Sequence, residues 1–196
     1  METSSKFIAA ELDESLAALG AAAKSASFIG QIDAISDAII ASLRQGGKVL
    51  FAGNGGSASD AQHIAGEFVS RLNYDRAPLA GLALTTDTSV MTAIGNDYGY
   101  EQIFSRQVAG IGQAGDVFVG ISTSGRSPNI LAAFKAAQAK GLRTVGFTGA
   151  KGGVMADHCE LLLNAPSDRT PIIQQLHITA AHIVCGLVES ALFPKV

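Results

Sequence analysis

The chain has 196 residues, of which 47% are hydrophobic and 16% charged. This apolar content can build a sizeable core and argues against intrinsic disorder. Fourteen basic against 17 acidic residues give a net charge of −3, whereas nucleic-acid-binding proteins usually carry a basic excess, so we expect no nucleic-acid partner. The charged fraction lies below the ~25% of typical soluble chains, which indicates a surface partly covered by other subunits.

The cysteines and the apolar runs bear on where the protein works. Cys159 and Cys185 lie in different segments without a CxxC spacing, so no disulfide framework is expected, which favours a reducing compartment. The beginning of the chain, METSSKFIAAELDESL, lacks a basic stretch followed by an apolar core, so no signal peptide is predicted. The sequence contains no run of ~18 apolar residues, so no membrane span is predicted. We therefore expect a cytoplasmic protein with no membrane partner.

The predicted elements begin with two helices. Apolar residues recur at helical spacing from Phe7 to Leu19 and from Ile32 to Leu43, and Gly46-Gly47 ends the second helix. Short apolar runs then alternate with amphipathic segments. Strands are predicted at 48–52, 79–84, 116–121, 143–147 and 159–163, with helical segments to about residue 71, to about 110, at 128–140 and at 171–192. This alternation predicts a single α/β domain over residues 1–196, with a parallel sheet covered by helices on both faces.

The final helix is apolar on all sides. Its apolar residues run from Ile172 to Leu192 without confining themselves to one stripe. Such a helix is buried, either in the core of one chain or at an interface between subunits.

The first candidate binding loop is Gly53-Asn54-Gly55-Gly56-Ser57, between a strand and a helix. Glycines let the backbone approach a ligand closely, and a helix N-terminus offers unpaired N–H groups to an anion. Two other interpretations stay open. The loop can be a tight turn without a ligand, or part of a dinucleotide-binding fold, because GNGGSA fits a loosened G-x-G-x-x-A pattern. No acidic residue obviously ends the second strand, which argues against the dinucleotide.

The second candidate loop contains Ser122, Thr123, Ser124 and Ser127, four hydroxyls within six residues, followed by Pro128 and a helix. Hydroxyl and backbone N–H donors at a helix N-terminus suit a phosphomonoester. Ser127 can also act simply as the N-cap, but capping does not explain the other three hydroxyls. The loop therefore predicts phosphate binding.

Histidines at two helical positions form a candidate metal site. His63 and Glu67 are four residues apart, so they share one helix face and can form half of a zinc site. The final helix adds Gln174 and His182, although a lone histidine in its apolar TAAHIVCG segment is more often a core residue. These two residues are ~12 Å apart along the helix axis at ~1.5 Å per residue. Both can reach one ion only if the ion lies between them.

Asn96-Asp97 is a further candidate for substrate binding. These side chains can hydrogen-bond sugar hydroxyls, or they can simply form a turn, which asparagine and aspartate favour. The residues themselves leave both interpretations open.

Taken together, four segments resemble the phosphoheptose isomerases, a group of the sugar-isomerase (SIS) domain proteins. The resemblance covers essentially the whole chain and rests on KVLFAGNGGSASDAQHIAGEF, ALTTDTSVMTAIGNDYGYEQIFSRQV, GDVFVGISTSGRSPNILAAF and IIQQLHITAAHIVCGLVE. It implies a flavodoxin-like three-layer sandwich with a five-stranded parallel sheet and extra N-terminal helices. It also implies a homotetramer with active sites near subunit interfaces.

The resemblance further implies one Zn²⁺ per subunit and a set of site residues. By position, the family's zinc ligands fall on His63, Glu67, Gln174 and His182. Its substrate contacts fall on Asn54, Gly55, Gly56, Glu67, Asn96, Asp97, Ser122, Thr123, Ser124, Ser127 and Gln174. The stretch Ala58-Ser59-Asp60 varies in the family, and Asp60 is expected to add a polar group at the pocket.

The implied reaction converts D-sedoheptulose 7-phosphate to D-glycero-D-manno-heptose 7-phosphate through an enediol, the first step of activated heptose synthesis for lipopolysaccharide or capsule. Proton movement between C1 and C2 needs an acid and a base, and the resemblance implies that Glu67 and His182 are this catalytic pair. One alternative is a non-catalytic SIS-domain protein that binds the replication initiator. Such a protein lacks equivalents of Glu67 and His182. Another is an SIS isomerase for a different sugar phosphate.

Overall fold

The computed structural model describes residues 2–195, in which five parallel strands form one sheet. The spatial order is β2-β1-β3-β4-β5. The strands are β1 (Val49–Gly53), β2 (Gly81–Ala83), β3 (Val117–Ile121), β4 (Arg143–Thr148) and β5 (Leu161–Asn164). The helices are α1 (Glu2–Lys24), α2 (Ala26–Arg44), α3 (Gly56–Val69), α4 (Thr88–Tyr98), α5 (Ser105–Ile111), α6 (Pro128–Ala139) and α7 (Thr170–Leu192), with 3₁₀ turns η1 (Tyr100–Gln102) and η2 (Gly153–Asp157).

The predicted parallel α/β sheet is confirmed, with two strands shorter than expected. β2 begins at Gly81, because the N–H of Leu79 donates to the carbonyl of Phe68 at the end of α3 rather than to a strand. β5 begins at Leu161, because the segment before it forms η2, whose carbonyl at Met155 accepts from the thiol of Cys159.

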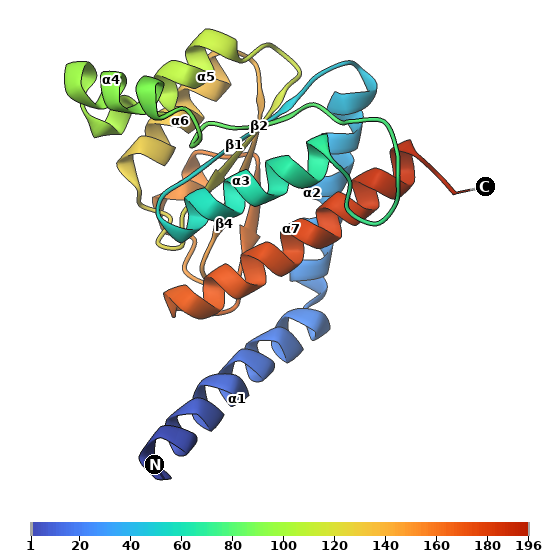
Figure 1. Ribbon diagram of the computed structural model, residues 1–196, viewed down its shortest axis with the longest axis vertical. Coiled ribbons are helices and arrows are strands. Elements are labelled where there is room, and N and C mark those ends of the chain that lie inside the picture. The colour runs from blue at the N-terminus through green and yellow to red at the C-terminus, as the bar shows by residue number, and fades with distance from the viewer. Residues whose placement is uncertain (1, 196) are drawn as a thin grey trace.

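The central strands are buried on both faces because their side chains alternate between two cores. In β1, Val49 and Phe51 join the core formed with α2, α3 and α7, whereas Leu50 and Ala52 join the core formed with α5 and α6. The result is the three-layer sandwich seen in Figure 1, with the sheet between two layers of helices.

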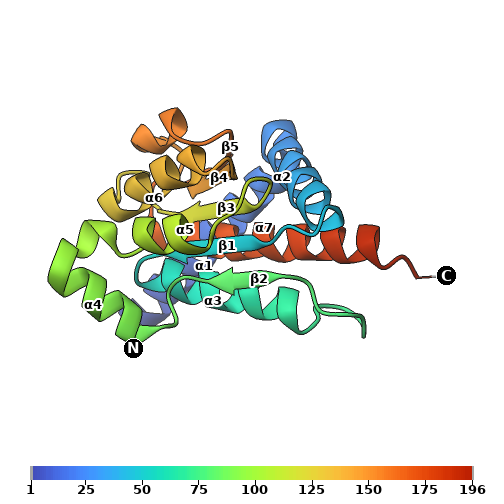
Figure 2. The same ribbon diagram turned by 90° about the horizontal axis from the view of Figure 1, so that it is seen from above.

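The strand order brings the two predicted binding loops together. β1 and β3 are neighbours, and the chain leaves them toward opposite edges of the sheet. Ligands bind at such a switch point, outside the carboxyl ends of the strands. Figure 2 shows the arrows of β2 and β3 pointing toward the side where α4 lies, so the loops after the strands face that side.

Helix α1 extends away from the body of the chain (Figure 1) and carries an exposed apolar stripe. Phe7, Ile8, Leu12, Leu16 and Leu19 are 45–67% exposed. The stripe borders a groove of about 170 Å³ that Leu176 and Thr179 of α7 also line. Ion pairs from Arg169 to Glu11 and Glu14 hold α1 against the start of α7.

Helices α2 and α7 are long and apolar enough to cross a membrane, judged by length and composition alone. Their most apolar windows are 39% and 50% buried within the protein, and core helices pass the same test. The predicted burial of α7 holds for most of its length, but Ile183 and Leu187 are 46% and 39% exposed in the single chain.

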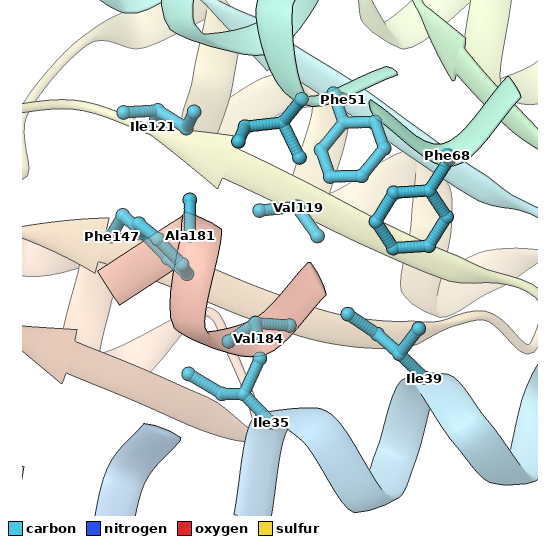
Figure 3. Close-up of a pocket in the computed structure, with 10 residues that line it drawn as sticks. Ile35, Ile39, Phe51, Phe68, Val119, Ile121, Phe147, Ala181 and Val184 are labelled. Atoms are coloured by element: carbon cyan, nitrogen blue, oxygen red, sulfur yellow. The ribbon is translucent and has the colours of Figure 1, made fainter. Parts of the chain in front are cut away.

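A small cavity lies inside the core formed with α2, α3 and α7, between α2, α7 and the sheet (Figure 3). Its volume is about 20 Å³, and only apolar side chains line it, among them Ile35, Phe51, Val119 and Val184. A cavity without polar groups offers no partners for water or a sugar. This cavity is therefore a packing defect of the core, and the binding site lies at the sheet edge.

Candidate functional site

The first loop approaches α7 at a glycine. An added Cβ at Gly56 would lie 2.4 Å from Nε2 of Gln174. Only glycine permits this approach, because real Cβ atoms do not come closer than 3.0 Å to a neighbour. The contact places the amide of Gln174 beside the backbone of the predicted binding loop, at the start of α3.

Asn54 in the same loop is held by two residues that the sequence analysis did not single out. Its side chain exchanges two hydrogen bonds with Asn129 of α6, at 2.8 and 2.9 Å, and accepts a third from the Tyr100 hydroxyl at 3.1 Å. Asn129 is 2% exposed. The amide pair ties the loop after β1 to the helix that follows the second loop. The one sequence signal for this pair is Asn129, a polar residue just inside the N-terminus of a helix.

The second loop gathers its hydroxyls as predicted. The Oγ of Ser122 lies 2.8 Å from that of Ser127 and 3.4 Å from that of Ser124, and the N–H of Arg126 donates to Ser124. Ser127 occupies the N-cap position of α6, but its side chain makes no capping bond. The capping interpretation of its hydroxyl is therefore wrong, and this hydroxyl belongs to the cluster at the helix N-terminus, where an anion binds favourably.

A cavity of about 230 Å³ adjoins this cluster. Thr123 and Ser124 line it together with Arg126 and Lys151, whose ammonium pairs with Asp168. Asp168, which also lines the cavity, offsets the charge of Lys151, so Arg126 supplies the net positive charge next to the hydroxyls, which suits an anionic group.

His63, Glu67 and His182 come together although 119 residues separate the two histidines. The two Nε2 atoms lie 3.0 Å apart, and Nε2 of His63 lies 3.3 Å from Oε1 of Glu67. One ligand atom of each residue lies within 4.8 Å of the others. His63 and Glu67 are 50% and 21% exposed, so the cluster is accessible. Two imidazoles and a carboxylate at this spacing can hold a metal ion.

Gln174 lies on the same helix as His182 but at a different level. Gly56 meets Gln174, and seven residues along α3, His63 meets His182. Helices α3 and α7 therefore run side by side in the same direction, as Figure 1 shows. Within residues 2–195, Gln174 makes no hydrogen bond with the three clustered residues, so its ligand role stays a prediction.

The remaining candidates differ in position. Asn96 and Asp97 lie in the last turn of α4, exposed, and hydrogen-bond each other at 2.8 Å. The turn considered from the sequence is wrong, and their substrate role stays a prediction. Asp60 lies on α3 three residues before His63. Burial raises the pKa of the Asp60 carboxyl, and nearby His63 opposes that shift. Its Oδ2 is buried without a hydrogen-bond partner among the described residues.

His177 supports the core rather than the cluster. It is 1% exposed, its Nε2 lies 3.0 Å from the carbonyl of Thr148, and its ring packs edge-on against Phe147. Burial lowers the pKa of His177 to about 4, although the hydrogen bond to Thr148 acts in the opposite direction. The ring is therefore neutral near pH 7.

Comparison with known proteins identifies the family of the chain. The SIS domain family matches residues 14–149. A phosphoheptose isomerase of Burkholderia pseudomallei is 63% identical over 167 residues, 85% of each chain, and one of Bradyrhizobium is 52% identical over 185 residues, 94% of this chain and 93% of that one. The structure of a phosphoheptose isomerase from Neisseria gonorrhoeae superimposes with a TM-score of 0.89 at 42% identity, over 95% of this chain and 98% of that one. The chain belongs to the SIS domain family and, within it, to the phosphoheptose isomerases.

Proposed function

We propose that this chain converts D-sedoheptulose 7-phosphate to D-glycero-D-manno-heptose 7-phosphate. Its family membership makes it an aldose–ketose isomerase. The observation that carries the proposal is the His63–Glu67–His182 cluster, which offers proton-transfer groups, and the hydroxyls gathered at the N-terminus of α6 add a candidate anion site.

The phosphate end of the substrate binds at the second loop in this proposal. Ser122, Thr123, Ser124 and Ser127 donate hydrogen bonds, and the N-terminus of α6 adds its partial positive charge. The sugar hydroxyls extend toward the first loop, where Asn54, Gly55 and Gly56 contact them. Asn96, Asp97 and Gln174 complete the set of substrate contacts.

The residues present fit one zinc ion per subunit. Among the described residues, the ring nitrogens of His63 and His182 contact each other, and His63 contacts Glu67. Two imidazoles and a carboxylate are ligands that zinc commonly takes. Gln174 is the fourth ligand in this proposal. When bound, zinc would polarise the substrate carbonyl and stabilise negative charge on its oxygen.

Proton transfer is the work of Glu67 and His182. One takes the proton from the carbon next to the carbonyl and returns it to the neighbouring carbon, and the other moves a proton between the two oxygens of the enediol. Their ligand atoms lie within 4.8 Å of each other, so both groups can reach the same C1–C2 unit.

The setting we propose follows from the same family. The enzyme works in the cytoplasm as a homotetramer and catalyses the first step of activated heptose synthesis for lipopolysaccharide or capsule. The exposed stripe of α1 and the exposed Ile183 and Leu187 of α7 are the surfaces that support a subunit interface.

The test measures turnover of sedoheptulose 7-phosphate beside fructose 6-phosphate and ribulose 5-phosphate, with zinc content determined on the same samples. Glu67→Gln and His182→Asn each keep approximate volume and hydrogen bonding, so the fold survives. Each is expected to lower kcat/KM by at least the ~10²–10⁴-fold typical of general acid–base catalysis. Glu160→Gln and His158→Asn are matched controls away from the cluster and keep wild-type activity.

Two results would count against the proposal. If the variant Glu67→Gln keeps more than about a tenth of wild-type kcat/KM, then Glu67 is not the base, given those magnitudes. If one of the smaller sugar phosphates is turned over faster than the heptulose, the substrate assignment is wrong.

A further inference from the structure

The candidate catalytic groups depend on the relative position of two helices. His63 and Glu67 lie on α3, and His182 lies on α7. Glu67 is the third residue from the end of α3, where backbone carbonyls have no partner within the helix. A helix end frays unless other groups satisfy these carbonyls, and fraying would displace the Glu67 carboxylate.

Arg76 satisfies these carbonyls from the loop that follows α3. Its guanidinium donates to the carbonyl of Glu67 at 2.8 Å and to that of Phe68 at 2.8 Å, with a longer contact of 3.3 Å to Ser70. The side chain is only 4% exposed. A planar guanidinium can serve several acceptors at once, so Arg76 is a cap for the end of the helix that carries Glu67.

Glu189 fixes Arg76 from the other helix. It lies on α7 seven residues after His182, two turns along the helix. Its Oε1 lies 3.1 Å from Nε of Arg76, and its carboxylate accepts from the N–H groups of Leu72 and Asn73 at 3.1 and 2.9 Å. Burial raises the pKa of the Glu189 carboxyl, but the hydrogen bonds from Asn73, Leu72 and Arg76 outweigh it, so the pKa lies below its usual value.

We propose that Arg76 and Glu189 are positioning residues, which lock the end of α3 to α7 and thereby hold Glu67 in register with His182. The inference rests on the proposed function, because it names what that site needs in order to stay assembled. Arg76 hydrogen-bonds Glu67 at its backbone carbonyl, so the pair acts on the position of the helix that carries Glu67.

A buried ion pair alone is weak evidence of a role in the site, because removing either partner also destabilises the fold. The arrangement here differs in where the hydrogen bonds end. Arg76 donates to the carbonyl of Glu67 itself, and Glu189 shares α7 with His182. The pair therefore links the two sides of the cluster directly.

The test uses the conservative variants Arg76→Lys and Glu189→Gln in the full-length protein. Lysine keeps the charge but cannot serve Glu189 and the carbonyls together, and glutamine keeps the shape of Glu189 without its charge. Turnover of sedoheptulose 7-phosphate gives kcat and KM, and competition with a chelating indicator gives the Kd for Zn²⁺. Val108→Ala, a fully buried residue of the opposite core, is the control for a general loss of stability.

Each variant is expected to lower kcat and to raise the Kd for Zn²⁺ by ~10–100-fold, as for residues that orient metal ligands. KM should stay within about twofold of wild type, since the proposed phosphate contacts lie in the loop before α6 and not on α3 or α7. The double variant is expected to lose less than the product of the two single losses, because both changes break one linkage. Val108→Ala lowers Tm and leaves kcat and the Kd for Zn²⁺ unchanged.

The inference is overturned if both variants keep kcat and the Kd for Zn²⁺ near wild type, or if Val108→Ala shows the same losses at an equal fall in Tm. These outcomes are distinct from failure of the proposed function. If wild type binds Zn²⁺ but does not isomerise the heptulose, the substrate proposal fails, and the zinc affinities of the variants still decide the positioning role.

Discussion

The variant Gly56→Ala is expected to lower the activity of the protein without lowering its stability. The new Cβ would lie 2.4 Å from Nε2 of Gln174, while ordinary contact begins at 3.4 Å, so this amide must retreat by about 1 Å. Gln174 is the far end of a flexible side chain and can move. A displacement of ~1 Å in a substrate-positioning group can cost ~10²-fold in rate, and we expect a loss of that order in kcat/KM.

The stability of this variant should not fall with its activity. Gly56 does not have a positive φ, and replacing glycine by alanine at a compatible position stabilises a protein by ~0.4–1 kcal/mol through the unfolded state. This gain offsets the cost of moving Gln174. Gly66→Ala is the matched control on the same helix, because an added Cβ there has no neighbour within 4 Å. The assay pairs kcat/KM with Tm for both variants. Wild-type turnover in Gly56→Ala, or an equal loss in Gly66→Ala, would refute the role of the Gly56–Gln174 contact.

Two further predictions concern pH and assembly. His177 has a pKa of about 4 when folded against about 6.5 unfolded. Protonation of the unfolded chain therefore leaves the free energy of unfolding unchanged above about pH 6.5 and lowers it by about 3 kcal/mol as pH falls toward 4. Urea titrations should show a shallower loss between pH 6.5 and 4.5 for His177→Gln than for wild type, and equal slopes would contradict this. Light scattering at micromolar concentration should give four times the 20.1 kDa of one chain. Leu16→Lys, in the exposed α1 stripe, should reduce that mass, and a wild-type monomer would contradict the assembly.

The local parts of the site could be predicted from the sequence because their geometry is local. Residues four apart on a helix share a face, which fixed the pairing of His63 with Glu67 in advance. Hydroxyls clustered before Pro128 predicted a cradle at a helix N-terminus. In both cases the relevant distances depend on a single element, so residue types and spacing were sufficient.

Long-range contacts could not be predicted in the same way. The Asn54–Asn129 pair spans 75 residues and the Arg76–Glu189 pair spans 113. Nothing in the local pattern distinguishes Glu189 from a solvated acidic residue at the end of an apolar helix. Its burial depends on which helix packs beside α7 and at what level.

That packing follows from one fact that the sequence pattern does not contain, the order of the strands. Crossovers between parallel strands are right-handed. Two connections that step across the sheet in opposite directions therefore place their helices on opposite faces. The chain leaves β1 for β2 in one direction and β3 for β4 in the other, which puts α3 on the face covered by α7 and α6 on the opposite face. The same reversal sets the loops after β1 and β3 side by side. One topological choice thus brings the helices that carry the candidate metal ligands together on one face, and it sets the hydroxyl-rich loop after β3 beside the glycine-rich loop that begins α3.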